Sequence, residues 1–500
     1  MAAPFLLGVI ANMGGLFRHV GLWLGLALCG TILLFPVPGG MTPAAMSVAA
    51  VAVLMAVWWI TEAIPIPATA MLPIVLFPIL EVMSTSQVTS SYANHLIYLF
   101  MGGFMLAMAI EKWNLHKRIA LHTVLLVGSA PDRIVLGFML ATAFLSAWIS
   151  NTATAMLMVT IAMSVLSQVA DSNNKLDNNG VVIPSNFGAS LMLGIAYAAS
   201  IGGVATLIGT PPNAILAGVV EKEYGYSIGF VEWMQFAAPL SLMMLAIAWW
   251  YLTRFAFRND MQALPGGRAV VMQQLDELGV MSRQEWRVLI VFSLVVAAWL
   301  LRGLSDWEIW GEVKDSNIAI AGALLLFVLP SGRGGGEKLL DWGSAVKIPW
   351  DIIILFGGGF ALASGFSSSG LTQWIGEQFV LLHGVSLIGL VLVVVCVVIF
   401  LTEVTSNTAT ASLLLPVMAG VALAAEAPAM VLMGSVALAA SFAFMLPVAT
   451  PPNAIVFSSH QVSIAQMARV GVWMNAVGIV VITAFITQWL PWVLVLPALG

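Results

Sequence analysis

The sequence Ser-Asn-Thr-Ala-Thr-Ala occurs twice, at residues 150–155 and 406–411, each time inside a long apolar stretch. Hydroxyl groups, the asparagine side-chain carbonyl and free backbone carbonyls are hard oxygen ligands, which suit a small alkali cation better than a transition metal. Hydroxyl protons, amide groups and backbone N–H groups can instead face an anion, helped by a helix N-terminus. The same segment could therefore bind a cation on one side and a carboxylate on the other.

A second polar motif, Thr-Pro-Pro-Asn-Ala-Ile, is also doubled, at residues 210–215 and 450–455. Two consecutive prolines remove two backbone donors and clash with the preceding turn, so each motif predicts a break in the middle of a long apolar helix. Carbonyls such as those of Gly209 and Ala449 would then lack helical partners. Unpaired backbone at membrane depth is tolerated only where it lines a cavity or is buried in protein.

A hydroxyl residue precedes each Ser-Asn-Thr segment by one helical turn. Ser146 lies four residues before Ser150, and Thr402 lies four residues before Ser406, so each pair is expected to share a helix face. We predict two symmetry-related cation sites from these groups. The first combines Ser146, Ser150, Asn151 and the backbone near Gly209, and the second combines Thr402, Ser406, Asn407 and the backbone near Ala449.

None of the 18 Lys and Arg residues falls in these motifs. An anion at the middle of a membrane would therefore have no fixed counter-ion, and such a charge is costly there. Co-bound cations would neutralise it, so cation and anion are expected to bind interdependently. This interdependence is a physical route to coupled transport. Glu403, beside Thr402, could bind a cation or a proton, or could only pair with a neighbouring hydroxyl.

The composition predicts the structural class. Of the 500 residues, 60% are hydrophobic and only 8% are charged, whereas a soluble domain carries about 25% charged residues. Many apolar runs approach the roughly 20 residues that a spanning helix needs, which predicts an all-α polytopic membrane protein. No basic patch interleaved with aromatic residues occurs, so no nucleic-acid partner is expected. The two cysteines, Cys29 and Cys396, lie in apolar runs and are expected to pack there.

Three pairs of matching segments occur in the same order along the chain, which indicates an internal duplication. The two polar motifs are preceded by a third pair, Phe100–Ala107 and Phe356–Ala363. The positive-inside rule places the N-terminus in the cytoplasm and the C-terminus outside, because most Lys and Arg residues fall on one predicted side. The two units then run in opposite senses, as in secondary transporters whose binding sites lie at the repeat interface.

The predicted organisation has a leading helix, two inverted repeats and a connecting cytoplasmic loop. Each Ser-Asn-Thr segment is flanked by apolar arms too short to span, which predicts a re-entrant hairpin with the motif at its tip. The predicted ranges are 1–40 for the leading helix, 41–258 for the first repeat (hairpin 131–168, broken helix 187–222), 259–284 for the loop, and 285–500 for the second repeat (hairpin 384–425, broken helix 429–459).

These motifs, together with the segments Trp58–Leu80 and Leu355–Ala363, resemble the divalent anion/sodium symporter family, which carries dicarboxylates, tricarboxylates or sulfate. The resemblance covers nearly the whole chain. It implies a homodimer in the plasma (cell inner) membrane, with about eleven transmembrane helices per protomer. It also implies a scaffold domain and a transport domain that moves like an elevator.

The resemblance also implies roles for individual residues. Both Ser-Asn-Thr tips would bind sodium and the substrate carboxylates, and a further substrate contact would come from the second broken helix. The substrate-binding residues implied in this way are Ser150, Asn151, Thr152, Ser406, Asn407, Thr408, Thr450 and Pro451. The two sodium sites of the family coincide with the cation sites predicted above from symmetry.

The expected substrate is a C4-dicarboxylate such as succinate, malate or fumarate, carried together with sodium. Alternatives are a sodium-independent dicarboxylate exchanger and a symporter for citrate or sulfate. A channel is a third class, in which anion flux would not need to saturate or to depend steeply on sodium. An enzyme is not expected, because a hydrolase needs a nucleophile paired with a base and no His lies beside a motif serine.

Overall fold

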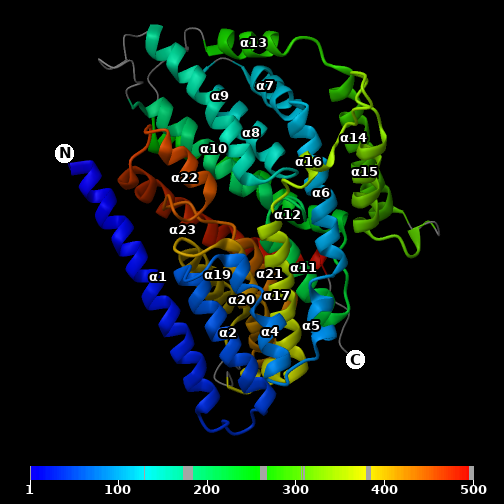
Figure 1. Ribbon diagram of the computed structural model, residues 1–500. Coiled ribbons are helices and arrows are strands. Elements are labelled where there is room, and N and C mark those ends of the chain that lie inside the picture. The colour runs from blue at the N-terminus through cyan, green and yellow to red at the C-terminus, as the bar shows by residue number, and fades with distance from the viewer. Residues whose placement is uncertain are drawn as a thin grey trace.

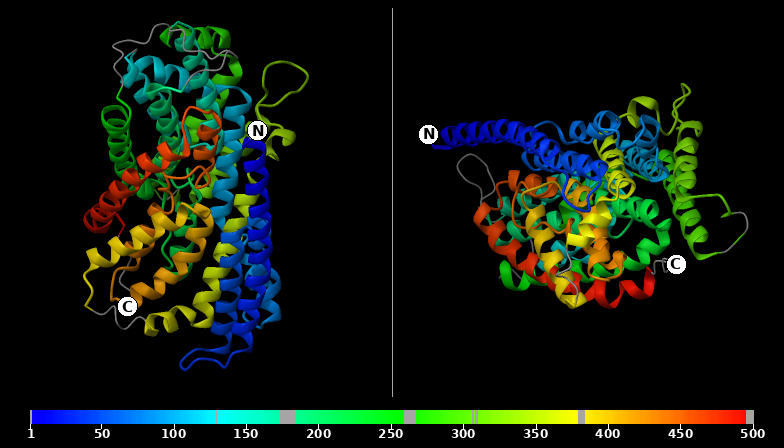
Figure 2. Two further views of the ribbon diagram at one scale, coloured as in Figure 1. Left: turned by 90° about the vertical axis from the view of Figure 1, so that its left-hand side faces the viewer. Right: turned by 90° about the horizontal axis from the view of Figure 1, so that it is seen from below.

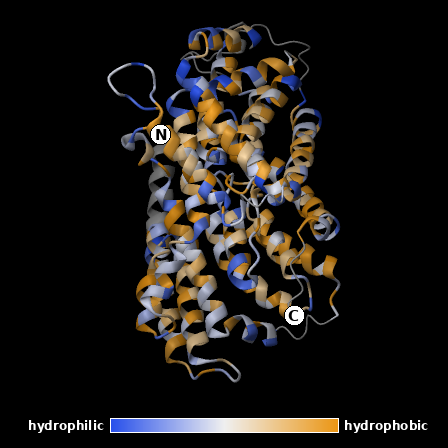
Figure 3. Ribbon diagram, turned by 90° about the vertical axis from the view of Figure 1, so that its right-hand side faces the viewer, coloured by the Kyte–Doolittle hydropathy of each residue, from blue (hydrophilic) through white to orange (hydrophobic). Residues whose placement is uncertain are grey.

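The computed structural model describes residues 2–128, 130–172, 184–258, 267–305, 307, 310–378 and 384–494. Within these ranges every regular element is a helix, and the only extended pairing is an isolated bridge between Pro330 and Lys338. Nine helical stretches of the described chain are long and apolar enough to cross a membrane, and four shorter apolar helices accompany them. Hydrophobic residues run along most of these helices in Figure 3. The predicted all-helical polytopic class is therefore confirmed.

The chain begins with two long helices that pack against each other, α1 (Ala2–Leu34) and α2 (Pro43–Thr61). The indole Nε1 of Trp58 on α2 donates a hydrogen bond of 3.2 Å to the carbonyl of Leu22 on α1. Figure 1 shows α1 as the long blue helix along the outside of the molecule. The short helices α3 (Ile66–Thr69), α4 (Leu72–Ile79) and α5 (Thr85–Ser91) then lead into the body of the protein.

The glycine-rich segments lie in α6 (His95–Lys112) and α17 (Trp350–Ser369). A Cβ added at Gly102 would lie 2.7 Å from the backbone carbon of Ala319 on α15 (Asp315–Val328). A Cβ added at Gly358 would clash in the same way with the backbone of Ala70. These glycines let helix backbones approach closely, which is their common use in membrane proteins.

Each Ser-Asn-Thr segment lies between two helices, as the hairpin prediction requires. The first pair is α8 (Pro131–Ser146) and α9 (Asn151–Ser172), and the second is α19 (Leu387–Thr402) and α20 (Asn407–Ala424). In Figure 1, α8 and α9 occupy the upper part of the molecule, and α19 and α20 the lower part. The predicted first hairpin is slightly too short, because α9 continues four residues beyond position 168.

The two broken helices are α10 (Asn186–Val204) with α11 (Pro211–Tyr224), and α21 (Ala429–Ala439) with α22 (Pro451–Ser458). The prolines begin the second helix of each pair, where their missing N–H group is not needed. The breaks lie before them, at residues 205–210 and 440–450. Proline disfavours helical geometry in the preceding residue, and Thr210 and Thr450 are accordingly extended, with φ of −145° and −143°.

The remaining helices connect and enclose these elements. The stretch predicted as a loop at 259–284 contains a helix, α13, which lies at the upper end of Figure 1. In the left view of Figure 2 the yellow and orange helices of the second half lie to one side of the long blue helix α1. The remaining helices are α7 (Leu115–Val127), α12 (Phe230–Tyr251), the π-helix η1 (Leu252–Ala256), α13 (Gly267–Leu278), α14 (Arg283–Leu304), α16 (Trp342–Ala345), α18 (Leu371–Gln378), α23 (Ile464–Gln488) and α24 (Leu490–Val493).

Candidate functional site

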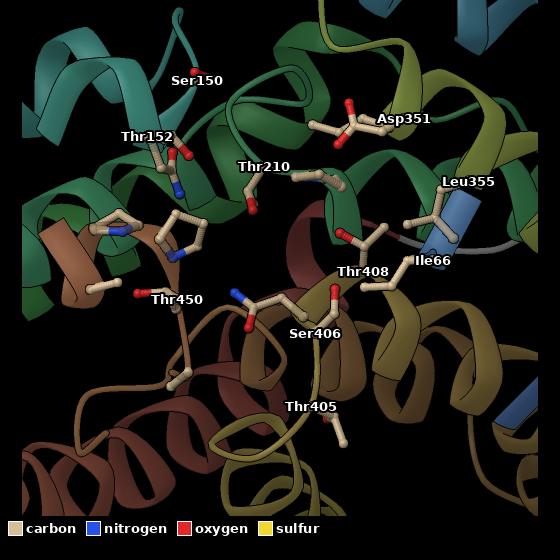
Figure 4. A pocket seen from close by; sticks show the side chains of 18 of the residues that line it. Ile66, Ser150, Thr152, Thr210, Asp351, Leu355, Thr405, Ser406, Thr408 and Thr450 are labelled. Carbon is tan, nitrogen blue, oxygen red and sulfur yellow. The ribbon is translucent and has the colours of Figure 1, made fainter. Parts of the chain in front are cut away.

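A cavity of about 540 Å³ lies where the two Ser-Asn-Thr segments meet the two Thr-Pro-Pro segments. Figure 4 shows residues of the first half, Ser150 and Thr152, facing Ser406 and Thr408 of the second half across this space. All eight residues that the sequence assigns to substrate binding line the cavity: Ser150, Asn151, Thr152, Ser406, Asn407, Thr408, Thr450 and Pro451. Gly209 and Ala449 line it as well, whereas Ser146 and Thr402 are completely buried behind it.

Four helices begin at the cavity. The first residues of α9, α11, α20 and α22 are Asn151, Pro211, Asn407 and Pro451, and all four line it. The first turn of each helix carries the positive end of the helix dipole. In α9 and α20, which do not begin with proline, that turn also has N–H groups without helical partners. Four such ends around one space favour an anion there. The tertiary structure therefore brings together four helix N-termini that are far apart in the sequence.

Behind the first tip, three oxygen atoms converge. The hydroxyl of Ser146, at the end of α8, lies 2.5 Å from Oδ1 of Asn151 and 2.7 Å from the carbonyl oxygen of Ala199 on α10. A hydroxyl has only one proton to donate, so it cannot satisfy both oxygens at once. A cluster of oxygen atoms with too few protons is the kind of environment that suits an alkali cation.

The second half repeats this arrangement. The hydroxyl of Thr402, at the end of α19, lies 2.7 Å from Oδ1 of Asn407 and 2.9 Å from the carbonyl oxygen of Ala440. Thr402, like Ser146, is fully buried. The structure thus brings the hydroxyl and asparagine of each predicted cation site into contact, on the side of the tip away from the cavity.

Two glycines bring the backbone of the first break next to the tip. A Cβ added at Gly203 would lie 2.8 Å from Oδ1 of Asn151 and 3.0 Å from the carbonyl oxygen of Gly209. A Cβ added at Gly209 would clash with the carbonyl of Gly203. Larger residues would therefore push the Gly209 backbone away from Asn151, with which it is predicted to share a cation.

The charge around the cavity is unusual for an anion site. No Lys, Arg or His is among the described residues that line it, and its two charged residues are the acids Glu62 and Asp351. Both carboxylates are exposed. Glu62 ends α2 in a left-handed conformation, with φ of 47°, and forms an exposed ion pair of 3.4 Å with Arg18. A dianion in this cavity would meet no fixed positive side chain.

Glu403 binds backbone N–H groups and does not line the cavity. Its buried carboxylate accepts hydrogen bonds of 2.7, 2.9 and 3.1 Å from the backbone N–H groups of Phe444, Met445 and Leu446. It accepts a further bond of 2.7 Å from the side-chain amide of Asn475. Four donors on one carboxylate fix the second break in place. In the first half Thr206 has the corresponding role, since its hydroxyl donates to the carbonyl of Ala147 at 2.5 Å.

Sequence reasoning missed two groups of residues. The first is the wall contributed by helices outside the polar motifs, including Trp59, Phe100, Asp351 and Leu355. Trp59, Phe100 and Leu355 belong to segments that indicated the repeat or the family resemblance, but nothing in those segments pointed to the cavity, and Asp351 lies outside them. The second is the pair Asn213 and Asn453, which are completely buried and bind the interrupted backbone. The sequence did mark these two asparagines, because both belong to the doubled Thr-Pro-Pro-Asn motif.

Comparison with known proteins agrees with this architecture. Residues 17–496 match the family described as the sodium:sulfate symporter transmembrane region. The sodium-dependent dicarboxylate transporter SdcS of Staphylococcus aureus (strain USA300) is 45% identical over 95% of this chain and 92% of its own length. The protein of the same name from Staphylococcus saprophyticus is 44% identical over 98% of this chain and 93% of its own length.

Two solved structures share the fold at low sequence identity. The MtrF protein of Neisseria gonorrhoeae, described as one of a class of antimetabolite efflux pumps, has a TM-score of 0.54 at 12% identity and covers 82% of this chain and 84% of its own. The YdaH transporter of Alcanivorax borkumensis, described as having an unusual topology, has a TM-score of 0.55 at 14% identity and covers 81% and 88%. These two similarities concern the fold alone.

Proposed function

The chain belongs to the family of the sodium:sulfate symporter transmembrane region, and we propose that it couples the entry of sodium to the uptake of a C4-dicarboxylate such as succinate. The relatives that are 44–45% identical are named for sodium-dependent dicarboxylate transport. The protein is a multi-pass membrane transporter and not an enzyme. The observation that carries the proposal is the cavity, which four helix N-termini surround and no basic side chain of the described chain lines.

Charge balance links this cavity to sodium. Two carboxylates brought into a membrane-embedded cavity need compensation, since uncompensated charge there is costly. The helix N-termini supply only partial charges. Two sodium ions, one behind each tip, would supply the rest. The dicarboxylate would then bind weakly without sodium, and sodium would bind weakly without the dicarboxylate, because the coupling is reciprocal.

In this proposal each tip has two faces. The substrate carboxylates contact the cavity face, formed by Ser150, Asn151 and Thr152 in the first half. The equivalent face in the second half has Ser406, Asn407 and Thr408, with Thr450 and Pro451 at the start of α22. The sodium ions bind on the other face, between Ser146, Asn151 and the Gly209 carbonyl, and between Thr402, Asn407 and the Ala449 carbonyl. The hydroxyl–amide contacts of 2.5 and 2.7 Å support this assignment.

We further propose that the helices carrying the site move as a unit relative to the rest, within a homodimer whose N-terminus is cytoplasmic and whose C-terminus is outside. The site residues come from α8–α11 and α19–α22. Glu221, at the end of α11, is bound by His95 of α6 at 2.7 Å and by Lys314, which precedes α15, at 2.9 Å. An elevator movement would have to break this cluster in every cycle.

Uptake into proteoliposomes tests the function. Radiolabelled succinate should accumulate when sodium is higher outside and should not when potassium replaces sodium. An exchanger would instead require a dicarboxylate inside the vesicles and would ignore sodium, while a channel would show flux that does not saturate. Unlabelled sulfate and citrate should compete less well than fumarate and malate; stronger competition by sulfate would assign the protein to sulfate.

Substitutions at the tips test the site. Asn151→Ala and Asn407→Ala should each abolish sodium-dependent uptake while leaving the protein folded and inserted. Asn186→Ala is the matched control, since this exposed asparagine donates to the carbonyl of Arg258 and does not line the cavity. Normal uptake by both tip variants would refute the assignment of the residues without refuting transport.

A further inference from the structure

Asn213 and Asn453 hold the two breaks by the same hydrogen bonds. Each is the third residue of the helix that follows its break, and each is fully buried. The amide nitrogen of Asn213 lies 2.7 Å from the carbonyl oxygen of Thr206, seven residues earlier, and 3.3 Å from that of Gly203, ten residues earlier. The amide nitrogen of Asn453 reaches the carbonyls of Leu446 and Ala443, again seven and ten residues earlier, at 3.0 and 3.1 Å.

These carbonyls need a donor for a simple reason. The carbonyl of Gly203 belongs to the last turn of α10, which leaves carbonyl groups without helical partners. The carbonyls of Thr206, Ala443 and Leu446 lie in the breaks themselves, where regular helical hydrogen bonding has stopped. A buried unpaired carbonyl costs about 1–3 kcal/mol. Prolines at the start of the next helix cannot help, because they have no N–H group. The side-chain amide directly after the prolines supplies two protons at the required place. One asparagine side chain thus binds the backbone carbonyls of each break.

The backbone that the two asparagines fix is next to the backbone carbonyls that are assigned to the cation sites. Gly203 faces the amide of Asn151 and the carbonyl of Gly209, since a Cβ there would lie 2.8 and 3.0 Å from their oxygens. The N–H groups of Gly209 and Ala449 donate to the carbonyls of Thr206 and Leu446, which are the carbonyls that the two asparagines bind. A shift of either asparagine would therefore also displace Gly209 or Ala449, whose carbonyls are assigned to sodium.

We propose that Asn213 and Asn453 are positioning residues that set the size of the two sodium sites. Each amide NH₂ group fixes the carbonyls of its break, so that the oxygens around the cation keep a spacing suited to sodium. This inference rests on the proposed sodium-coupled transport. In this inference the amide NH₂ group of each asparagine positions the backbone. The acceptor atoms, Oδ1 of Asn213 and Asn453, have no hydrogen-bond partner among the described residues.

Asparagine-to-aspartate substitution separates the two ends of the side chain. Aspartate keeps the shape and the Oδ1 position but replaces the amide nitrogen with an oxygen that cannot donate when ionised, so it would repel the carbonyls that asparagine binds. If instead Oδ1 acted as a sodium ligand, a negative charge at the same position would strengthen cation binding. The donor role thus predicts a loss of sodium affinity in Asn213→Asp, and the ligand role predicts no loss or a gain.

The experiment measures succinate uptake into proteoliposomes as a function of sodium and, separately, of lithium. Asn213→Asp and Asn453→Asp should each raise the half-saturating sodium concentration about tenfold or more. Both variants should also reduce the preference for sodium over lithium. A purely structural defect would lower the number of active molecules but would leave this ion preference unchanged. Asn94→Asp is the matched control, because Asn94 acts through its acceptor oxygen, which receives the N–H of Leu96 at 2.8 Å; it should behave like the wild type.

Unchanged sodium dependence and ion preference in folded Asn213→Asp and Asn453→Asp would overturn the inference. If the aspartate variants are not recovered folded, Asn213→Ser and Asn453→Ser replace them, since serine has one short donor and no charge. They should show the same shift, and wild-type sodium dependence in both would also overturn it. A wild-type protein without sodium-dependent uptake would instead refute the proposed function, so the two failures are distinguishable.

Discussion

The hydroxyl oxygen of Thr402 lies 2.7 Å from the side-chain oxygen of Asn407, and the two belong to different helices of one pair. Ser146 and Asn151 repeat this relationship at 2.5 Å in the other half of the chain. The last residue of one helix thereby meets the first residue of the next on both sides of the cavity. This contact joins each tip to the carbonyls behind it.

Removal of either hydroxyl should weaken sodium binding. Ser146→Ala and Thr402→Val each delete one oxygen of a cation site, and an interaction with a charged group contributes about 1.5–3 kcal/mol, which corresponds to a rise in half-saturating sodium of roughly ten- to a hundredfold. Sodium titration of succinate uptake measures the shift. Thr160→Val is the control, since its exposed hydroxyl only binds the carbonyl of Met156 on α9. An unshifted titration for both variants would contradict the predicted cation sites.

Glu403 should matter for stability. Glu403→Ala leaves the N–H groups of Phe444, Met445 and Leu446 without their acceptor, and a buried donor left unsatisfied costs about 1–3 kcal/mol. The melting temperature of the purified protein in detergent should therefore fall by several degrees. Glu111→Ala, which alters an exposed glutamate at the end of α6, should leave it nearly unchanged. An equal melting temperature in both variants would argue against this role.

The charge of Asp351 should act on anion and cation in opposite directions. Its exposed carboxylate at the cavity repels a dianion and attracts sodium. Asp351→Asn should therefore lower the KM for succinate and raise the half-saturating sodium concentration. Because exposed charges interact by less than about 1 kcal/mol, each change should be about two- to threefold and should shrink at high ionic strength. Asp351→Glu keeps the charge and should behave like the wild type; a similar shift in that variant would point to shape instead of charge.

Cross-linking tests whether α11 moves past α6. The imidazole Nε2 of His95 lies 2.7 Å from Oε1 of Glu221, so cysteines at these two positions are close enough for a short thiol-specific cross-linker. The native Cys29 and Cys396 must first be replaced. Cross-linking of His95→Cys/Glu221→Cys should stop succinate uptake, and each single variant treated with the same reagent should remain active. Undiminished uptake by fully cross-linked protein would exclude an elevator movement between these helices.

Part of the fold and of the site followed from the sequence. The helical class follows from composition, because a chain with 60% hydrophobic and 8% charged residues can satisfy its backbone in a membrane by forming helices. The doubled motifs identified the polar residues that line the cavity, since a polar triplet repeated inside two apolar stretches is a local signal. The boundaries of the two repeats and the roles of the tips stay predictions that the experiments above address.

Other features depended on contacts between distant residues. Glu403 was open to two interpretations because its partners lie 41–72 residues further along the chain and form no pattern with it. The segments of α2, α6 and α17 that form the cavity wall could not be assigned to the site for the same reason. The breaks lie directly before the prolines because proline fits the first turn of a helix. The sequence by itself determined which polar groups the membrane-embedded chain contains. The tertiary structure alone decided which groups meet, because packing of separate helices, and not spacing along one helix, sets those distances.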